Sequence, residues 1–166
     1  MRTYREAAQF VYDLPYGRTS STTETIAVLR EGRGTCSSKH ALLAQLAVEQ
    51  GLMIKLMLGI YLMNERNTPG VGRVLSKYGL CEIPEAHCYL LQNVERIDVT
   101  RPVLPPRETI DFVEEEELSP EQIGDYKTAR HKAFIQKWLR SANLSTVWSL
   151  ERLWTAREEC IAALTK

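Results

Sequence analysis

The spacing of apolar residues predicts helices in the first third of the chain. Apolar side chains fall at helical spacing in residues 3–13 and 35–50, which places them on one face of a helix. The short apolar run in residues 26–29 follows a polar loop, residues 19–25, that supplies an N-cap for a further short helix. Thr35 is a suitable N-cap for the helix at residues 35–50, and Gly51 lies where a glycine often ends a helix. We therefore expect three helices before the chain reaches residue 52.

The middle of the chain has the pattern of strands. Residues 53–63 form an apolar run interrupted by a lysine, which favours a buried strand. A long connection rich in glycine and proline follows in residues 64–84. Residues 86–92 and 94–100 then have the length and composition of two strands joined in a hairpin.

Helices return in the last third. The acidic run Glu114–Glu117 is interpreted as a solvated linker or the approach to a helix. Ser119 followed by Pro120 and Gln122 is a typical helix start. We expect one long helix from there to about residue 139 and a final helix over residues 144–161. Helices, strands and helices in this order predict an α+β fold with a small antiparallel sheet.

Length and composition indicate one soluble globular domain spanning residues 1–166. Hydrophobic residues make up 44% and charged residues 25%, which excludes a disordered chain. Basic and acidic residues both number 21 and form no long basic run, so nucleic acid is not an expected partner. The longest apolar stretch, near Leu52–Met63, is too short to span a bilayer, and no apolar segment follows the basic N-terminus as in a signal peptide, so no membrane association is expected.

The cysteine pattern predicts reduced thiols in the cytoplasm. The four cysteines are not spaced like a secreted disulfide framework, and no export signal precedes them. They are Cys36, Cys81, Cys88 and Cys160.

Cys36 is the first candidate for chemistry. It follows Gly32-Arg33-Gly34-Thr35 and falls in the first turn of the predicted helix. The unsatisfied N–H groups and the dipole at a helix start favour an anion, so they lower a thiol pKa and can bind an oxyanion. The alternative is that Cys36 is a small buried hydrophobic residue, as most free cysteines are.

His87 and Asp98 are the second candidate. A symmetric turn at Gln92-Asn93 pairs His87 with Asp98 across the predicted hairpin, with Cβ atoms about 5 Å apart. Asp98 can then orient one ring nitrogen while the other accepts a thiol proton, as in a nucleophile–base–acid triad. The alternative is a purely structural pair on the sheet.

A zinc site is a weaker hypothesis. Cys36 and His40 stand four residues apart on one helix face, and Cys81, His87 and Cys88 are further possible ligands. The spacing matches no common zinc pattern, so neither a metal nor another cofactor is expected. In the absence of zinc, His40 is interpreted as a partly exposed helix residue.

The nucleophile region resembles that of transglutaminase-like proteins. The resemblance rests on Val28–Cys36, on the helical residues 41–44 after it and on Gly51. That family continues with a strand, a histidine-bearing strand and an aspartate-bearing strand, which fall here on Met53–Tyr61, His87 and Asp98. The resemblance covers about residues 5–102 and leaves a C-terminal helical extension over about residues 119–164.

The resemblance implies a papain-like core and Cys-His-Asp chemistry on a peptide or amide substrate. Many bacterial members are hydrolases or proteases, so hydrolysis and acyl transfer both stay open. The family often has an aromatic residue, commonly Trp, soon after the histidine, whereas this chain has Cys88 and Tyr89. Family members also carry a separate oxyanion donor upstream of the nucleophile, for which Tyr16 is a candidate. An inactive binding module is therefore the alternative function, and the sequence fixes no oligomeric state.

Overall fold

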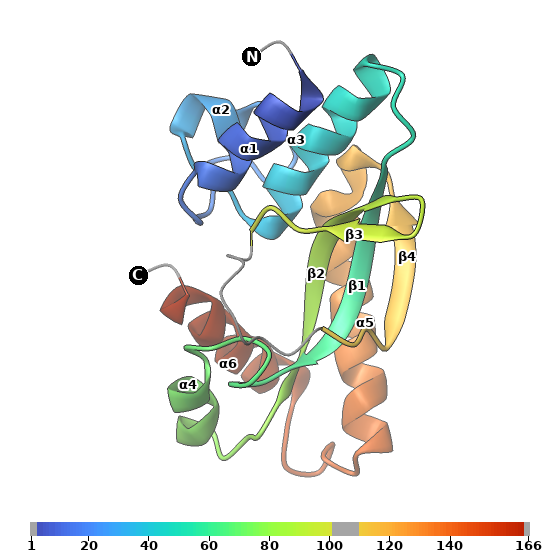
Figure 1. The fold of residues 1–166 in the computed structure, drawn as a ribbon. Coiled ribbons are helices and arrows are strands. Elements are labelled where there is room, and N and C mark those ends of the chain that lie inside the picture. The colour runs from blue at the N-terminus through green and yellow to red at the C-terminus, as the bar shows by residue number, and fades with distance from the viewer. Residues whose placement is uncertain (1–2, 101–109, 165–166) are drawn as a thin grey trace. The chain divides into compact units, whose positions relative to one another are not determined.

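The computed structural model describes residues 3–100 and 110–164, and within them the chain is α+β (Figure 1). Helices come first and last in the chain, and strands lie between them, so the predicted fold class is confirmed. The elements are α1 (Tyr4–Asp13), α2 (Ala27–Glu31), α3 (Cys36–Glu49), β1 (Lys55–Met63), α4 (Gly72–Lys77), β2 (Ile83–Gln92), β3 (Glu95–Ile97), β4 (Glu114–Leu118), the 3-10 helix η1 (Pro120–Ile123), α5 (Asp125–Ser141) and α6 (Leu150–Ala163). None of these helices has the length and apolar content needed to cross a bilayer.

The described residues divide into two compact units. The first holds residues 3–59, 87–100 and 115–127, and the second holds residues 60–86, 110–114 and 128–164. The four strands form one sheet in the order β3-β2-β1-β4.

The first unit is built around α3. Helices α1 and α2 and the short η1 pack against it, and α1, α2 and α3 lie together in Figure 1. Apolar side chains of all three helices meet inside this unit, including Val11, Val28, Leu43 and Ala47, each of which is buried. The predicted N-terminal helices are therefore confirmed to within a residue or two.

The second unit contains the long connection after β1. This connection is not wholly irregular, because residues 72–77 form α4, which packs on α6. Lys77 Nζ and Tyr78 Oη, at the end of α4, both donate to the Glu159 carboxylate of α6, each at 2.7 Å. His131 of α5 hydrogen-bonds the Pro84 carbonyl at 2.8 Å.

The hairpin of β2 and β3 has a different register from the predicted one. The turn lies at Asn93-Val94, and Leu90 pairs with Ile97 rather than with Glu95. Asn93 takes a left-handed conformation with φ of 55°, which asparagine tolerates well. Since side chains alternate with a period of two, a shift of two positions leaves each side chain on its predicted face.

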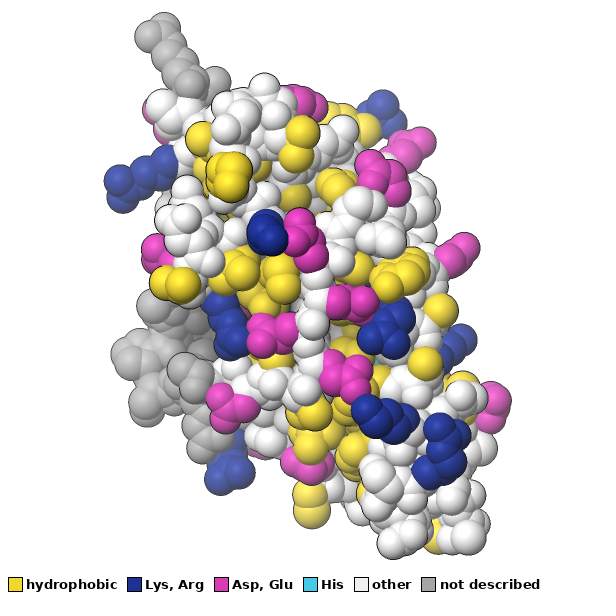
Figure 2. Space-filling model, turned by 90° about the vertical axis from the view of Figure 1, so that its right-hand side faces the viewer, with side chains coloured by type: hydrophobic (Ala, Val, Ile, Leu, Met, Phe, Trp, Pro, Cys, Tyr) yellow, Lys and Arg dark blue, Asp and Glu magenta, His cyan; other side chains and the backbone are white. Residues whose placement is uncertain are grey.

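The acidic run Glu114–Glu117 is strand β4 and not a linker, so that interpretation is wrong. Three of its glutamates have basic partners on other elements: Glu117 accepts from Lys55, Glu115 from Arg96 and Glu114 from Lys137. Figure 2 shows acidic and basic side chains interleaved on one face of the molecule. β4 ends the strand order, and a charged edge strand discourages pairing with other chains.

The predicted long helix after Ser119 is divided in two. Ser119 and Gln122 form the expected capping box, but the turn they cap is the 3-10 helix η1. Gly124, with φ −88° and ψ −112°, then interrupts the helical path before α5 begins at Asp125. Helix α5 carries Lys127 in its first turn.

Candidate functional site

Two glycines and a capping box fix the start of α3. Gly32 ends α2 in the left-handed conformation, with φ of 63°, and a Cβ on Gly34 would come within 2.8 Å of the Lys39 side chain. The Thr35 side chain accepts the Ser38 N–H, and the Ser38 hydroxyl accepts the Thr35 N–H. Cys36 is therefore the first residue of α3, as predicted from the sequence.

The segment before the cysteine is also tied to α1. Gly34 exchanges two backbone hydrogen bonds with the turn after α1, donating to the Pro15 carbonyl and accepting from Gly17, both at 3.2 Å. The buried ammonium of Lys39 donates to the Leu14 carbonyl at 2.5 Å. Tyr16, the candidate oxyanion donor, forms a parallel bridge with Gly34, so its backbone lies beside the loop that leads to Cys36.

His87 and Asp98 are in direct contact. Nε2 of His87 lies 2.7 Å from Oδ2 of Asp98, so Asp98 reaches His87 although the two are not paired directly across the hairpin. The other carboxylate oxygen, Oδ1, accepts both the N–H and the hydroxyl of Thr100, at 2.9 and 2.8 Å. Although burial raises the pKa of Asp98, His87 and these hydrogen bonds hold it well below its usual range.

Cys36 completes the group. Its thiol hydrogen-bonds the His87 side chain, and because Nε2 faces Asp98, Nδ1 is the nitrogen left for the sulfur. Cys36 and His87 are 6% and 8% exposed, so the contact is shielded but not sealed from solvent. The structure thus brings the three predicted residues together on α3, on β2 and directly after β3, while their catalytic roles stay a prediction.

The electrostatics of the group favour a thiolate–imidazolium pair. Burial raises the pKa of Cys36, but the positive charges of Lys127 and His87, the His87 hydrogen bond and the Cys88 N–H lower it to about 6. Burial lowers the pKa of His87, but Asp98 and the Cys36 thiolate outweigh this and raise it to about 10. At neutral pH these shifts favour an ionised sulfur and a protonated imidazole, the states that a thiol nucleophile and its acid require.

Lys127 is a site residue that the sequence analysis missed. Its side chain is almost wholly buried, and Nζ donates at 2.8 Å to the hydroxyl of Ser37, the residue after Cys36. The same hydroxyl lies 3.7 Å from the Cys88 sulfur. Lys127 is 91 positions from Cys36 in the sequence and belongs to no motif, so only the three-dimensional structure identifies it.

His40 was interpreted as partly exposed, and this is wrong, because it is wholly buried. Nδ1 lies 2.7 Å from the Cys36 carbonyl, and Nε2 accepts the Val99 N–H at 2.9 Å. Since Nε2 accepts a backbone N–H, it carries no proton, and Nδ1 must be the donor to the carbonyl. His40 therefore links the first turn of α3 to the residue that follows Asp98.

This arrangement requires neutral His40. Burial is the main cause that lowers its pKa from 6.5 to about 4, and the nearby Asp98 carboxylate, 3.6 Å away, opposes the shift only partly. Protonation would place a second N–H against the Val99 N–H.

A pH dependence of stability follows from His40. Because the pKa is lower in the folded protein than in the unfolded chain, the unfolded chain binds more protons between pH 6.5 and about 4. Protonation of this histidine is therefore expected to remove about 3 kcal/mol from the free energy of unfolding by pH 4. The measurement is urea unfolding of the parent and of His40→Phe across this range.

The difference between the two profiles isolates His40 from other acid-sensitive groups. His40→Phe should be less stable at neutral pH, by about 1–3 kcal/mol, because the buried Val99 N–H loses its acceptor. The gap should narrow as the pH falls to about 4. A constant gap across that range would contradict the proposed state of His40.

The zinc hypothesis is not favoured by the contacts of its residues. Both ring nitrogens of His40 are already in hydrogen bonds to backbone groups, and Nε2 of His87 faces Asp98. Within residues 3–100 and 110–164, no three His, Cys, Asp or Glu side chains are arranged to hold a metal ion.

Comparison of the chain with known protein families, with curated proteins and with solved structures finds no match. The geometry and electrostatics of the site are therefore the basis for assigning a function.

Proposed function

We propose that the protein is a thiol-dependent amide or peptide hydrolase, or an acyltransferase, with Cys36 as nucleophile in a transglutaminase-like, papain-like core. The observation that carries the proposal is the buried chain of contacts from the Cys36 thiol to His87 and on to Asp98, with 2.7 Å between Nε2 and Oδ2. A nucleophile, a base and an orienting carboxylate in hydrogen-bond contact are the parts that acyl transfer through a thiol requires.

In the first half of the reaction, the Cys36 thiolate attacks the carbonyl carbon of the substrate amide. The electron pair of the carbonyl π bond moves to oxygen and forms a tetrahedral oxyanion. When this intermediate collapses, the carbon–nitrogen bond breaks and the His87 imidazolium gives its proton to the departing amine. The products of this half are a thioester at Cys36, a free amine and neutral His87.

In the second half, water or an acceptor amine attacks the thioester carbon. Neutral His87 accepts a proton from the attacking group, and the carbon–sulfur bond breaks to return the thiolate–imidazolium pair. Water gives a carboxylic acid, and an amine gives a new amide. Asp98, held by Thr100, keeps the imidazole in one orientation through both halves.

The start of α3 provides the stabilisation for the oxyanion. As the first helical residue, Cys36 has a backbone N–H with no acceptor within the helix, and the helix end favours negative charge. The Lys127 ammonium adds a positive charge next to this position.

Acylation by a small ester tests this proposal. Incubation with p-nitrophenyl acetate should transfer one acetyl group to Cys36, with release of p-nitrophenol, and hydroxylamine should remove it. Peptide mapping by mass spectrometry locates the acetyl group, and Cys36→Ala is the control. Acetylation of the exposed Cys81 alone would argue instead for a binding module that has kept only the fold.

Lys127 gives a separate prediction about the thiol. Lys127→Met should raise the pKa of Cys36 by at least about one unit, because a buried positive charge near the sulfur is lost. Lys127→Arg keeps the charge and should keep most of the effect. The pKa is read from the pH dependence of Cys36 alkylation, and equal profiles for the Met and Arg variants would contradict an electrostatic role.

A further inference from the structure

We propose that a cavity between α1, α2, α3 and η1 binds a small organic cation, whose apolar body fills the cavity and whose amine or guanidinium meets an acidic rim. The cavity has a volume of about 600 Å³ and lies wholly within the first unit. Preformed pockets of roughly 300–1,000 Å³ are the usual size for small-molecule ligands.

The cavity is distinct from the thiol site. Leu42, Leu46 and Glu49 recur along α3 at three- and four-residue spacing, so they share one face of the helix. Cys36 and His40 lie on another face, and none of Cys36, His87 and Asp98 lines the cavity. Binding here is therefore independent of whether the proposed acyl chemistry is correct.

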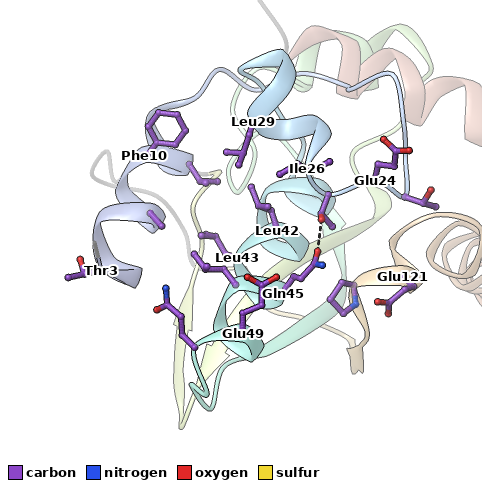
Figure 3. Close-up of a pocket in the computed structure, with 17 residues that line it drawn as sticks. Thr3, Phe10, Glu24, Ile26, Leu29, Leu42, Leu43, Gln45, Glu49 and Glu121 are labelled. Carbon is purple, nitrogen blue, oxygen red and sulfur yellow. Dashed lines mark hydrogen bonds between the residues drawn. The ribbon is translucent and has the colours of Figure 1, made fainter. Parts of the chain in front are cut away.

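The interior of the cavity is apolar. Figure 3 shows Phe10 of α1, Leu29 of α2 and Leu42 and Leu43 of α3 turned toward a common space. Leu43 is wholly buried and forms part of the floor, whereas Phe10 and Leu29 are at least two-fifths exposed at the opening. Apolar side chains left open to water around a cavity favour a ligand that covers them.

Polar side chains also line the wall of the cavity, among them Thr25 and Gln45. The Thr25 hydroxyl donates to the Gln45 side chain at 2.6 Å, the contact drawn as a dashed line in Figure 3. This hydrogen bond links α3 to the residue two positions before α2. The wall thus combines apolar side chains with polar ones.

The negative charge at the rim of the cavity favours a positively charged ligand. Glu24, Glu49 and Glu121 line the cavity, and the described residues that line it include no lysine, arginine or histidine. Glu24 is partly neutralised by Arg30 at 3.4 Å. Within the described residues Glu49 has no ion-pair partner, so a cation bound at the rim would supply one.

Binding of a matched pair of probes tests the proposal. 4-Phenylbutylamine and 4-phenylbutyrate share one apolar body and differ in charge, and each is titrated into the ¹⁵N-labelled full chain. We expect amide shifts clustered at α1, α2 and the second half of α3, with the amine binding about tenfold more tightly than the carboxylate. Equal affinities would overturn the choice of a cation, and shifts elsewhere, or none with either probe, would overturn the site.

Three variants separate the apolar and charged parts of the site. Leu46→Trp, at a half-buried position, should fill the cavity and lower the affinity for the amine by about tenfold or more. The double variant Glu49→Gln with Glu121→Gln should lower the affinity for the amine about threefold or more and should not lower the affinity for the carboxylate. The control Glu117→Gln, on β4, should change neither affinity. Because both rim positions are exposed, the double variant is expected to fold even if Leu46→Trp does not, and unchanged amine binding in it would overturn the proposal.

Discussion

In a His87→Ala variant, the pH at which Cys36 alkylation is half-maximal is expected to rise by more than about two units from its value of about 6. Burial alone raises the pKa of this thiol, and His87 is one of two positive charges that lower it. Without the imidazolium, Lys127 remains, and the thiol should return to the range of an ordinary cysteine, roughly 8.5.

The measurement is the full pH profile of alkylation by iodoacetamide, with the modified peptides separated by mass spectrometry. A single rate at neutral pH is less informative, because a thiolate becomes more nucleophilic as its pKa rises and this offsets part of the lost thiolate fraction. The exposed Cys81 of the same molecule is the internal reference, and its profile should not change. A Cys36 profile that is the same in the parent and in His87→Ala would refute the thiolate–imidazolium pair.

The elements that carry Cys36 were predictable because local sequence determines them. The N-cap at Thr35 depends only on residues within one turn of the helix. Gly32 and Gly51 take left-handed conformations that few other residues tolerate. The apolar spacing after Cys36 then gives the buried face of α3. These features depend on neighbours within a few residues, so the sequence pattern was sufficient.

The hairpin register was not predictable to the residue, although its consequence was. A turn at Gln92-Asn93 and one at Asn93-Val94 differ by one position, and the asparagine that adopts positive φ belongs to both. The two registers differ by two positions in pairing, so both place His87 and Asp98 on the same face. The prediction that the two side chains lie close together therefore did not depend on the exact register of the hairpin.

The contacts around Cys36, His87 and Asp98 were not predictable for a different reason. Thr100, His40 and Lys127 act through contacts with Asp98, Val99 and Ser37, and two of these contacts join residues 59 and 90 positions apart. A buried lysine or histidine has no local pattern that separates it from an exposed one on a helix. The acidic run of β4 was not predicted as a strand for the same reason, because its basic partners lie on segments that are distant in the sequence.

The largest expected loss of stability comes from a buried ion pair in the second unit. The Arg157 guanidinium donates through Nε and one terminal nitrogen to both oxygens of Glu85, at 2.6 and 2.5 Å. The two side chains are only 11% and 5% exposed, and burial with this bidentate geometry keeps the pair desolvated. Glu85→Gln should therefore lower the free energy of unfolding by about 3 kcal/mol or more, because it leaves a buried guanidinium with a neutral partner.

Urea unfolding of single and double variants separates this loss from a general effect of the substitution. Glu117→Gln breaks the exposed pair with Lys55 and should cost at most about 1 kcal/mol. Glu158 also accepts from Arg157, at 2.7 Å, and still partners the guanidinium in Glu85→Gln. The loss in the free energy of unfolding should therefore lie toward the lower end of the range for a broken buried ion pair. The double variant Glu85→Leu with Arg157→Met removes both charges and should recover much of the lost stability. If Glu85→Gln and Glu117→Gln were equally stable, the buried pair would contribute no more than a surface contact.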